Sequence, residues 1–282
     1  MHDIRFLDET LDINKTPNYH LSIQVGLDGF SFVIFDTSRY KYIALKHYGF
    51  KEEIPEFKFP GHLQNLLSGD EFLQKEFLSI HCIWNSPRTT LLPAVLFEKE
   101  KLRQYFEFNQ VLNDLDELHS NQIKSLDAYL IFTIHHEIAN VFIRQYPTLK
   151  FFNQGTPFIE YAMKHNPGNI DSVHINIQDK FFDILVIRNR SLILHNTFNW
   201  RYEQDLTYFI MNVYDKVLLD PASIPIYISG PVEKNSDLVN GIRKFIRTVN
   251  FCEPDNRFLY AHAFNRIPDH FFINLFNLYL CG

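Results

Sequence analysis

The sequence predicts an α/β protein of two lobes that share one duplicated unit, with a small insertion in the first lobe. Residues 22–35, SIQVGLDGFSFVIF, align without a gap with residues 174–187, HINIQDKFFDILVI, at a constant offset (174 − 22 = 152). A repeat of this length indicates two copies of one supersecondary unit. Strand-like and helix-like segments alternate after each copy, which is typical of α/β proteins. The length of 282 residues also agrees with about two domains.

Each copy opens with three strands that we expect to be antiparallel. In the first copy, apolar and polar residues alternate over residues 21–27, as in a half-buried strand. Asp28-Gly29 then gives a strong hairpin signal. Residues 30–35 are almost continuously apolar, which predicts a strand covered on both faces. The remaining strands of the two units are expected at residues 40–48 and within residues 173–198.

The rest of the first copy alternates between helices and strands. Thr156-Pro157 supplies an N-cap followed by Pro at the first helical position, so a helix is expected to start there and to run to about residue 164. The polar residues 109–122 suit a connector. The other expected segments are helical turns within 62–77, a strand at 78–84, a helix near 98–108, a strand at 123–134, a helix at 136–146 and a strand at 149–153.

The second copy continues in the same order with fewer residues. Apolar residues from Leu206 to Val217 recur at helical spacing. The later segments are expected as a strand at 224–229, a helix at 237–249, a strand at 257–264 and a final helix at 268–280. Matching residues 224–229 to residues 129–134 gives an offset of 95 (224 − 129), so about 57 residues (152 − 95) are inserted in the first copy.

These matches give a division of the chain into three parts. Residues 1–19 are polar and are expected to form a loosely held arm. The first lobe is expected at residues 20–154, with its insertion at about 78–125, and the second lobe, including the crossing helix, at residues 155–282. The expected core residues occupy the apolar runs and helix faces of both copies: Phe32, Ile34, Ile175, Ile177, Leu185, Ile187, Phe209 and Phe245.

Composition excludes several function classes. The formal charge of −6 favours neither nucleic acid nor an anionic membrane surface. The three cysteines lie far apart and form no CxxC pair, which favours a reduced, cytoplasmic protein. The acidic start MHDIRFLDETLDINK lacks the apolar run of a signal peptide, and the apolar residues 271–281 are too few to span a bilayer.

Three antiparallel strands, a helix, a strand, a helix, a strand and a crossing helix, present twice, resemble the actin-like ATPase fold, which is ribonuclease H-like. The insertion resembles the small extra subdomain of two bacterial branches, the cell-division actin homologue and the actin-like protein of type IV pilus assembly. The chain is also similar to a bacterial family of unassigned function built on a degenerate form of this fold. That similarity is carried by SIHCIWNSPRTTLLPAVLFEKEKLRQYFEFN.

The resemblance implies a nucleotide site between the lobes. In active members, an Asp-x-Gly turn in each first hairpin holds phosphates and Mg²⁺. Here the two Asp positions hold Gln24, followed by Gly26, and Asn176, followed by Gln178. The adenosine motif, a strand that ends in two glycines, would be Ile228-Ser229-Gly230-Pro231, where only one glycine remains. Gln154 is the nearest match to the water-orienting residue of active members.

Each candidate residue also has a structural interpretation. Gly26, Asp28 and Gly29 could bind phosphate, with Asp28 as a substitute metal ligand, or could form only a hairpin turn that needs positive φ. Asp179 and Lys180, after Gln178, could offer a cation to phosphate or form a solvated turn. Ser229-Gly230 could contact a base or serve as a strand exit. His135-His136-Glu137 and the basic residues Arg243, Lys244 and Arg247 are interpreted as structural and solvated, respectively.

Two functional hypotheses follow. The first is a non-catalytic or weakly nucleotide-binding protein of the actin-like fold that acts through protein–protein contacts, because both Mg²⁺ carboxylates are missing. It has no catalytic residue and no metal site, and no cofactor is expected. The second is an ATPase or phosphotransferase with ATP and Mg²⁺, in which Asp28 and Asp179 replace the missing ligands. Neither hypothesis involves nucleic acid or a membrane span, and the sequence does not name the protein partner.

Overall fold

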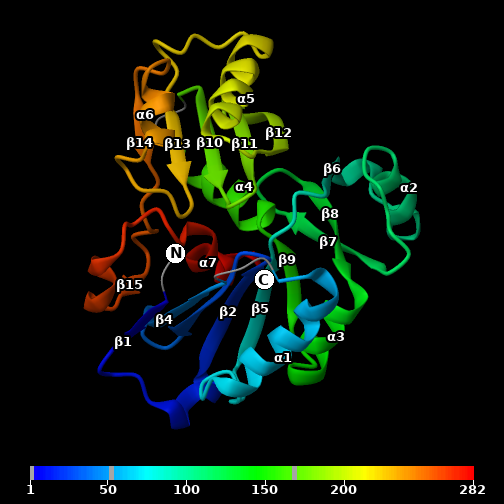
Figure 1. Ribbon diagram of the computed structural model, residues 1–282, viewed down its shortest axis with the longest axis vertical. Coiled ribbons are helices and arrows are strands. Elements are labelled where there is room, and N and C mark those ends of the chain that lie inside the picture. The colour runs from blue at the N-terminus through cyan, green and yellow to red at the C-terminus, as the bar shows by residue number, and fades with distance from the viewer. Residues whose placement is uncertain (1–2, 51–53, 167–169) are drawn as a thin grey trace.

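The protein, seen in a computed structural model that describes residues 3–50, 54–166 and 170–282, has two lobes, each built on a mixed sheet (Figure 1). A small antiparallel sheet projects from the side of the first lobe. The strand orders are β1-β4-β3-β2-β5-β9 in the first lobe, with β15 beside β4, and β12-β11-β10-β13-β14 in the second. The small sheet has the order β6-β8-β7.

The first lobe forms around an antiparallel meander that continues into parallel strands. Phe30, Phe32 and Ile34 of β3 pack under two helices, while Val33 and Phe35 face the opposite side. Both faces of this strand are therefore covered, as its continuous apolar run predicts. The elements are β2 (Tyr19–Gly26), β3 (Gly29–Asp36), β4 (Lys41–Gly49), α1 (Phe59–Gly69), β5 (Ser79–Trp84), α3 (His136–Gln145) and β9 (Lys150–Asn153).

The second lobe repeats this arrangement. Its elements are β10 (Ser172–Ile177), β11 (Phe181–Arg188), β12 (Ser191–Asn199), α5 (Glu203–Lys216), β13 (Ile226–Ser229), α6 (Asp237–Arg243) and β14 (Val249–Phe251). Strand β10 pairs antiparallel with β11 and parallel with β13, as β2 pairs with β3 and β5. The predicted duplication and fold class are confirmed.

The insertion begins and ends later than expected. Its elements are β6 (Thr89–Pro93), α2 (Leu102–Glu107), β7 (Asp116–Ile123) and β8 (Ala128–His135). Residues 78–84, expected in the insertion, are mostly β5 of the main sheet, which lies beside β2. Residues 129–134, matched in the sequence to residues 224–229 of the second copy, lie in β8, the central strand of the small sheet. An apolar run shows that a strand is buried but does not show which sheet contains it.

The residues expected to form a loose arm are partly ordered on the first sheet. Strand β1 (Ile4–Leu7) pairs antiparallel with β4, and Ile4 and Phe6 pack against the core beneath it. Residues 1–2 of this arm lie outside the described residues. The polar residues 109–122, expected as a connector, contain most of β7, which is an edge strand and tolerates polar side chains. Short 3₁₀ turns occur at Ile13–Asn18, Glu56–Lys58, Ala94–Leu96, Lys99–Lys101, His262–Arg266 and Leu278–Cys281.

Two helices link the lobes. Helix α4 (Gly155–His165) buries Phe158 and Ile159 against β11 and the small sheet, and it also packs against α7 (Ile273–Asn277). The segment expected as the final helix of the second lobe instead covers the first sheet. Leu275 and Phe276 pack on Phe35 and its neighbours, and the two-residue strand β15 (Leu259–Tyr260) pairs with β4. The expected strand at 257–264 is therefore short and belongs to the first lobe.

Six of the eight expected core residues are buried, while Phe209 is only partly buried, with its ring stacked on Phe198. Phe245 is 56% exposed, so its predicted burial is wrong. The reason is that α6 ends at Arg243 and residues 249–251 form β14, so the helical spacing used for Phe245 does not apply there.

Candidate functional site

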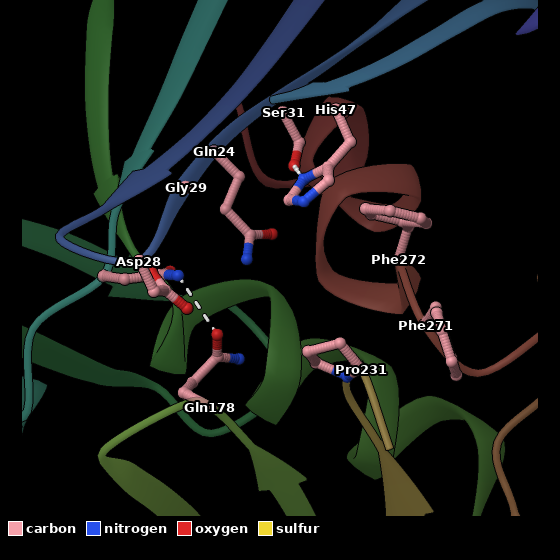
Figure 2. Close-up of a pocket in the computed structure, with 10 residues that line it drawn as sticks. Gln24, Asp28, Gly29, Ser31, His47, Gln178, Pro231, Phe271 and Phe272 are labelled. Carbon is pink, nitrogen blue, oxygen red and sulfur yellow. Dashed lines mark hydrogen bonds between the residues drawn. The ribbon is translucent and has the colours of Figure 1, made fainter. Parts of the chain in front are cut away.

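The two first hairpins meet at a cleft between the lobes. Figure 2 shows Gln24, Asp28 and Gly29 of the first lobe opposite Gln178 and Pro231 of the second. The part of this cleft that the centres of water molecules can occupy has a volume of about 40 Å³, which is room for about three waters. The other lining residues are Ser31, His47, Asn85, Phe271 and Phe272.

Steric crowding explains both glycines of the first hairpin, Gly26 and Gly29. Gly26 pairs with Gly29 across the turn, and neither has a positive φ, so that part of the turn interpretation is wrong. A Cβ on Gly26 would lie 2.6 Å from Oδ1 of Asp28 and 3.2 Å from Cβ of Asn85. A Cβ on Gly29 would lie 3.0 Å from Cε1 of His47. Close packing against neighbouring strands therefore accounts for both glycines.

Asn176, at the position expected to hold a metal ligand in the second lobe, is part of a hydrogen-bond network within the protein. Asn176 is 2% exposed. Its Nδ2 donates to Oγ of Ser229 (2.9 Å), and its Oδ1 accepts from Nε2 of Gln178 (2.6 Å) and Nδ2 of Asn274 (3.0 Å). The Ser229 hydroxyl in turn donates to the Ile175 carbonyl (3.1 Å). The Asn176 amide is therefore used by the protein itself.

The network continues across the cleft through Asn85, which follows β5 of the first lobe. Nδ2 of Asn85 donates to Oε1 of Gln178 (3.1 Å). A chain of neutral amides thus joins Asn85, Gln178, Asn176 and Asn274. Sequence reasoning missed Asn85 and Asn274, because Asn85-Ser86-Pro87 looked only like the end of a strand and Asn274 only like part of a helix.

Gln24, at the corresponding position of the first lobe, extends its side chain into the cleft (Figure 2). Nearby, Oγ of Ser31 lies 2.8 Å from Nδ1 of His47, a pair that sequence reasoning also missed. Burial lowers the pKa of His47 to about 4, so the ring is neutral at pH 7. None of the described lining residues therefore carries a positive charge at neutral pH.

The exit of β13 is closed by the C-terminal segment. Gly230 has φ +103°, and a Cβ there would lie 2.1 Å from the Ile177 carbonyl oxygen. The Gly230 N–H donates to the His270 carbonyl (2.8 Å), and Phe271 and Phe272 follow directly into the cleft. The backbone at Gly230 is thus packed against Ile177 and His270.

The turns of the two hairpins place acidic residues at the mouth of the cleft. The surrounding protein atoms, and then the Asp179 carboxylate, raise the pKa of Asp28. Lys180 acts in the opposite direction, so Asp179, Lys180 and Asp28 lie close enough to influence one another. A Mg²⁺ site of the active type does not fit here, because its two Asp positions hold amides and Asp28 is the one carboxylate among the described lining residues.

Gln154 does not face the cleft. Its Oε1 accepts from the Ser86 N–H (2.9 Å), and its Nε2 donates to the Ser86 carbonyl (2.9 Å) and to Oδ2 of Asp183 (3.2 Å). Asp183 is fully buried and also accepts from Oγ1 of Thr197 (2.6 Å). Burial raises the pKa of Asp183 to about 7. The residue that resembles a water-orienting group therefore joins the lobes instead.

Outside the cleft, the histidine motif forms a surface contact. His136 pairs with Glu117 of β7, and Nε2 of His136 lies 2.8 Å from Nδ2 of Asn140. Within residues 3–50, 54–166 and 170–282, no three His, Cys, Asp or Glu side chains are arranged to hold a metal ion. In the same part of the chain, no helix has the length and hydropathy needed to cross a bilayer.

The fold is shared with solved structures of low sequence identity. A Bacteroides thetaiotaomicron protein described as having an actin-like ATPase fold and unknown function is 24% identical, with a TM-score of 0.80 over 97% of this chain and 100% of that one. The PilM–PilN type IV pilus biogenesis complex matches with a TM-score of 0.59 and 10% identity, over 93% of this chain and 97% of that one. The ethanolamine utilization protein EutJ from Carboxydothermus hydrogenoformans matches with a TM-score of 0.52 and 10% identity, over 98% and 93% of the two chains.

These likenesses establish the actin-like ATPase fold, and the pilus branch expected from the sequence is among them. No curated protein matches the sequence. A family model described as "Protein of unknown function (DUF3822)" matches residues 8–249. The chain therefore belongs to the DUF3822 family.

Proposed function

We propose that this protein is a non-catalytic member of the actin-like fold that acts through protein–protein contacts and holds its lobes together without a nucleotide. The observation that carries the proposal is the use of Asn176 within the protein. Where an active member needs a carboxylate for Mg²⁺, Asn176 binds Ser229, Gln178 and Asn274. Because Gln178 also accepts from Asn85 of the other lobe, protein groups make the contacts across the cleft that a nucleotide makes in active members.

Charge and volume support this proposal. A triphosphate with Mg²⁺ needs carboxylates for the metal and cations or free N–H groups for the phosphates. The described lining residues offer neutral amides, a neutral His47 and the acidic Asp28. Pockets that enclose a drug-sized ligand measure about 300–1,000 Å³, whereas the inner volume here is about 40 Å³. A nucleotide would have to open the cleft and break the amide chain to enter.

Thermal unfolding with and without Mg-ATP tests the proposal. A ligand present at 100 times its dissociation constant stabilises a protein by about 2.7 kcal/mol, so a bound nucleotide gives a clear rise in Tm. We expect no rise with Mg-ATP, and no ATP hydrolysis by the purified protein. A saturable rise in Tm that needs Mg²⁺ would contradict the proposal.

Support for protein contacts comes from the insertion. Val95 and Phe108 are each 89% exposed, and Val111 is 73% exposed. A single exposed apolar residue is common on a protein surface, whereas residues 95–115 carry five large ones, Val95, Leu96, Phe108, Val111 and Leu115, and such a concentration is typical of interaction surfaces. The PilM–PilN structure is itself a complex of a protein with this fold, and we propose that this chain also binds a protein partner. Phe108→Ser should reduce the amount of that partner that co-purifies with the protein. Leu218→Ser, at an 87% exposed site in the second lobe, should leave that amount unchanged.

A second candidate function is supported by the acidic turns. Asp28 and Asp179 interact across the mouth of the cleft, and two carboxylates could hold Mg²⁺ together with phosphate oxygens and waters. An ATPase or phosphotransferase of this kind would lose activity in Asp28→Asn and in Asp179→Asn. Activity that depends on Mg²⁺ and on both carboxylates would favour this candidate over the first.

A further inference from the structure

The junction between the lobes contains a buried acid that neither functional hypothesis uses. Gln154 lies between the end of β9 and the start of α4, and its amide contacts both lobes. On one side it binds the backbone of Ser86, after β5 of the first lobe, and on the other it donates to Asp183 of β11. Any movement of one lobe against the other at this point changes the surroundings of Asp183.

Asp183 is enclosed by uncharged groups. Its exposed fraction is 0%, and its hydrogen-bond donors are Thr197 of β12 and Gln154. His195, two residues from Thr197 along β12, is neutral at pH 7 because burial lowers its pKa to about 4. Helix α4 begins at Gly155, directly after Gln154, and no charged residue is among the groups that shift the pKa of Asp183. Burial raises the pKa of Asp183, and the hydrogen bonds from Thr197 and Gln154 offset only part of this rise.

We propose that Asp183 is a proton-operated latch for the junction between the lobes. While protonated, the carboxyl is neutral and the junction stays closed. When ionised, the carboxylate is a buried charge without a cation, and it is relieved by opening that lets water reach it. The latch uses residues outside the cleft, so it holds whether or not the cleft binds a nucleotide.

The sign of the effect follows from linkage. The folded, closed state raises the pKa of Asp183 from 3.8 to about 7. Closure is therefore fully favoured below pH 4. It weakens as the pH rises toward 7, because opening then releases the proton that Asp183 holds in the closed state. If opening hydrates the carboxyl completely, the equilibrium constant for opening rises about 30-fold between about pH 5.5 and about pH 8.5.

The amide of Ser86 reports on the latch, because its N–H is bonded to Gln154 in the closed junction. Hydrogen exchange of this amide, corrected for the intrinsic effect of pH, should show protection falling by up to about 30-fold over that range. Asp183→Asn replaces the acid by an amide of the same shape that cannot ionise, and should remove the change. Asp255→Asn is the matched control, since Asp255 is also buried but bonds to Arg257 and has a pKa of about 2.

A second variant keeps the test independent of folding defects. Thr197→Val removes a donor that favours the carboxylate, so the Asp183 Cγ titration followed by carbon NMR should move to higher pH. The pH dependence of Ser86 protection should move with that midpoint, whereas a purely structural role for Asp183 would leave Ser86 protection unchanged. The proposal is overturned if Asp183 titrates below about pH 5, or if Ser86 protection changes with pH equally in wild type and Asp183→Asn.

Discussion

Replacing Gly230 by Ala tests whether the glycine after β13 is retained for the fold or for a nucleotide. The structure gives it a structural reason. Its φ of +103° lies in the region that favours glycine, and its N–H bonds to the His270 carbonyl. An added Cβ would lie 2.1 Å from the Ile177 oxygen, about 1 Å closer than real Cβ atoms approach. Gly230→Ala should therefore damage folding before any ligand is considered.

The expected cost has three parts. Placing an L-residue at this φ costs about 1–2 kcal/mol. Relieving the contact with Ile177 requires a backbone shift of about 1 Å, which resembles overpacking of a core and costs about 1–3 kcal/mol. The shift also weakens the hydrogen bond to His270, which is worth about 1 kcal/mol. We expect Gly230→Ala to lower the free energy of unfolding by about 4 kcal/mol in total.

Urea unfolding followed by circular dichroism measures this loss. Gly61→Ala is the matched control, because its Cβ would meet nothing within 4 Å on α1, and helix propensity favours Ala there by up to about 1 kcal/mol. A Gly230→Ala protein within about 1 kcal/mol of wild type would refute the structural reasoning. If that stable variant also lost a nucleotide affinity present in wild type, the glycine would belong to a binding site.

Three further outcomes are expected. Lys46 and Asp70 form a buried ion pair at 2.6 Å, so Lys46→Met alone should cost about 3–5 kcal/mol in urea unfolding. Adding Asp70→Leu should recover only part of the loss, because the Tyr48 hydroxyl and the Phe72 N–H then lose an acceptor; a double variant no more stable than Lys46→Met would contradict this. Burial opposes ionisation of Asp255, but hydrogen bonds from a neighbouring guanidinium lower its pKa to about 2. Asp255→Asn should thus be less stable than wild type by about 1–2 kcal/mol at neutral pH, with the difference vanishing as the pH falls from about 4 to 2; a difference that stays constant would be evidence against the ion pair. The double change Gln24→Asp with Asn176→Asp should lower Tm in the absence of metal and regain part of it with Mg²⁺, whereas a Mg²⁺ response in wild type would show a metal site that the hairpins do not explain.

The duplicated fold could be predicted because its evidence is local and repeated. The alternation over residues 21–27, the apolar run of residues 30–35 and the constant offset to residues 174–187 each fix part of the same hairpin. The insertion was placed wrongly because the apolar run of β8, the central strand of the small sheet, was matched to residues 224–229 of the second copy, whose counterpart in the first lobe is β5. Burial of Phe245 was wrong because helical spacing was extended past Arg243, where α6 ends.

The sequence predicted where the site lies, but not the hydrogen bonds within it. Gln24, Asp28, Gly29 and Gln178 do come together at the cleft, since the hairpins that carry them are equivalent. The partners of Asn176 could not be foreseen. Asn274 is 98 residues away along the chain, and an isolated Asn gives no local pattern. Long-range amide pairs of this kind depend on how α7 returns to the first lobe.

The return of residues 258–276 to the first lobe affects the order in which the two lobes can fold during translation. The strands of the second lobe come from one continuous stretch, residues 172–251, so this lobe has its own sheet as soon as that stretch leaves the ribosome. The first sheet does not: Val33, Phe35 and Tyr42 are covered by residues 258–276, which are made after the strands of the second lobe. Until then this apolar face is open to other nascent chains or to chaperones. The first lobe to be translated is therefore expected to be the last to complete its core.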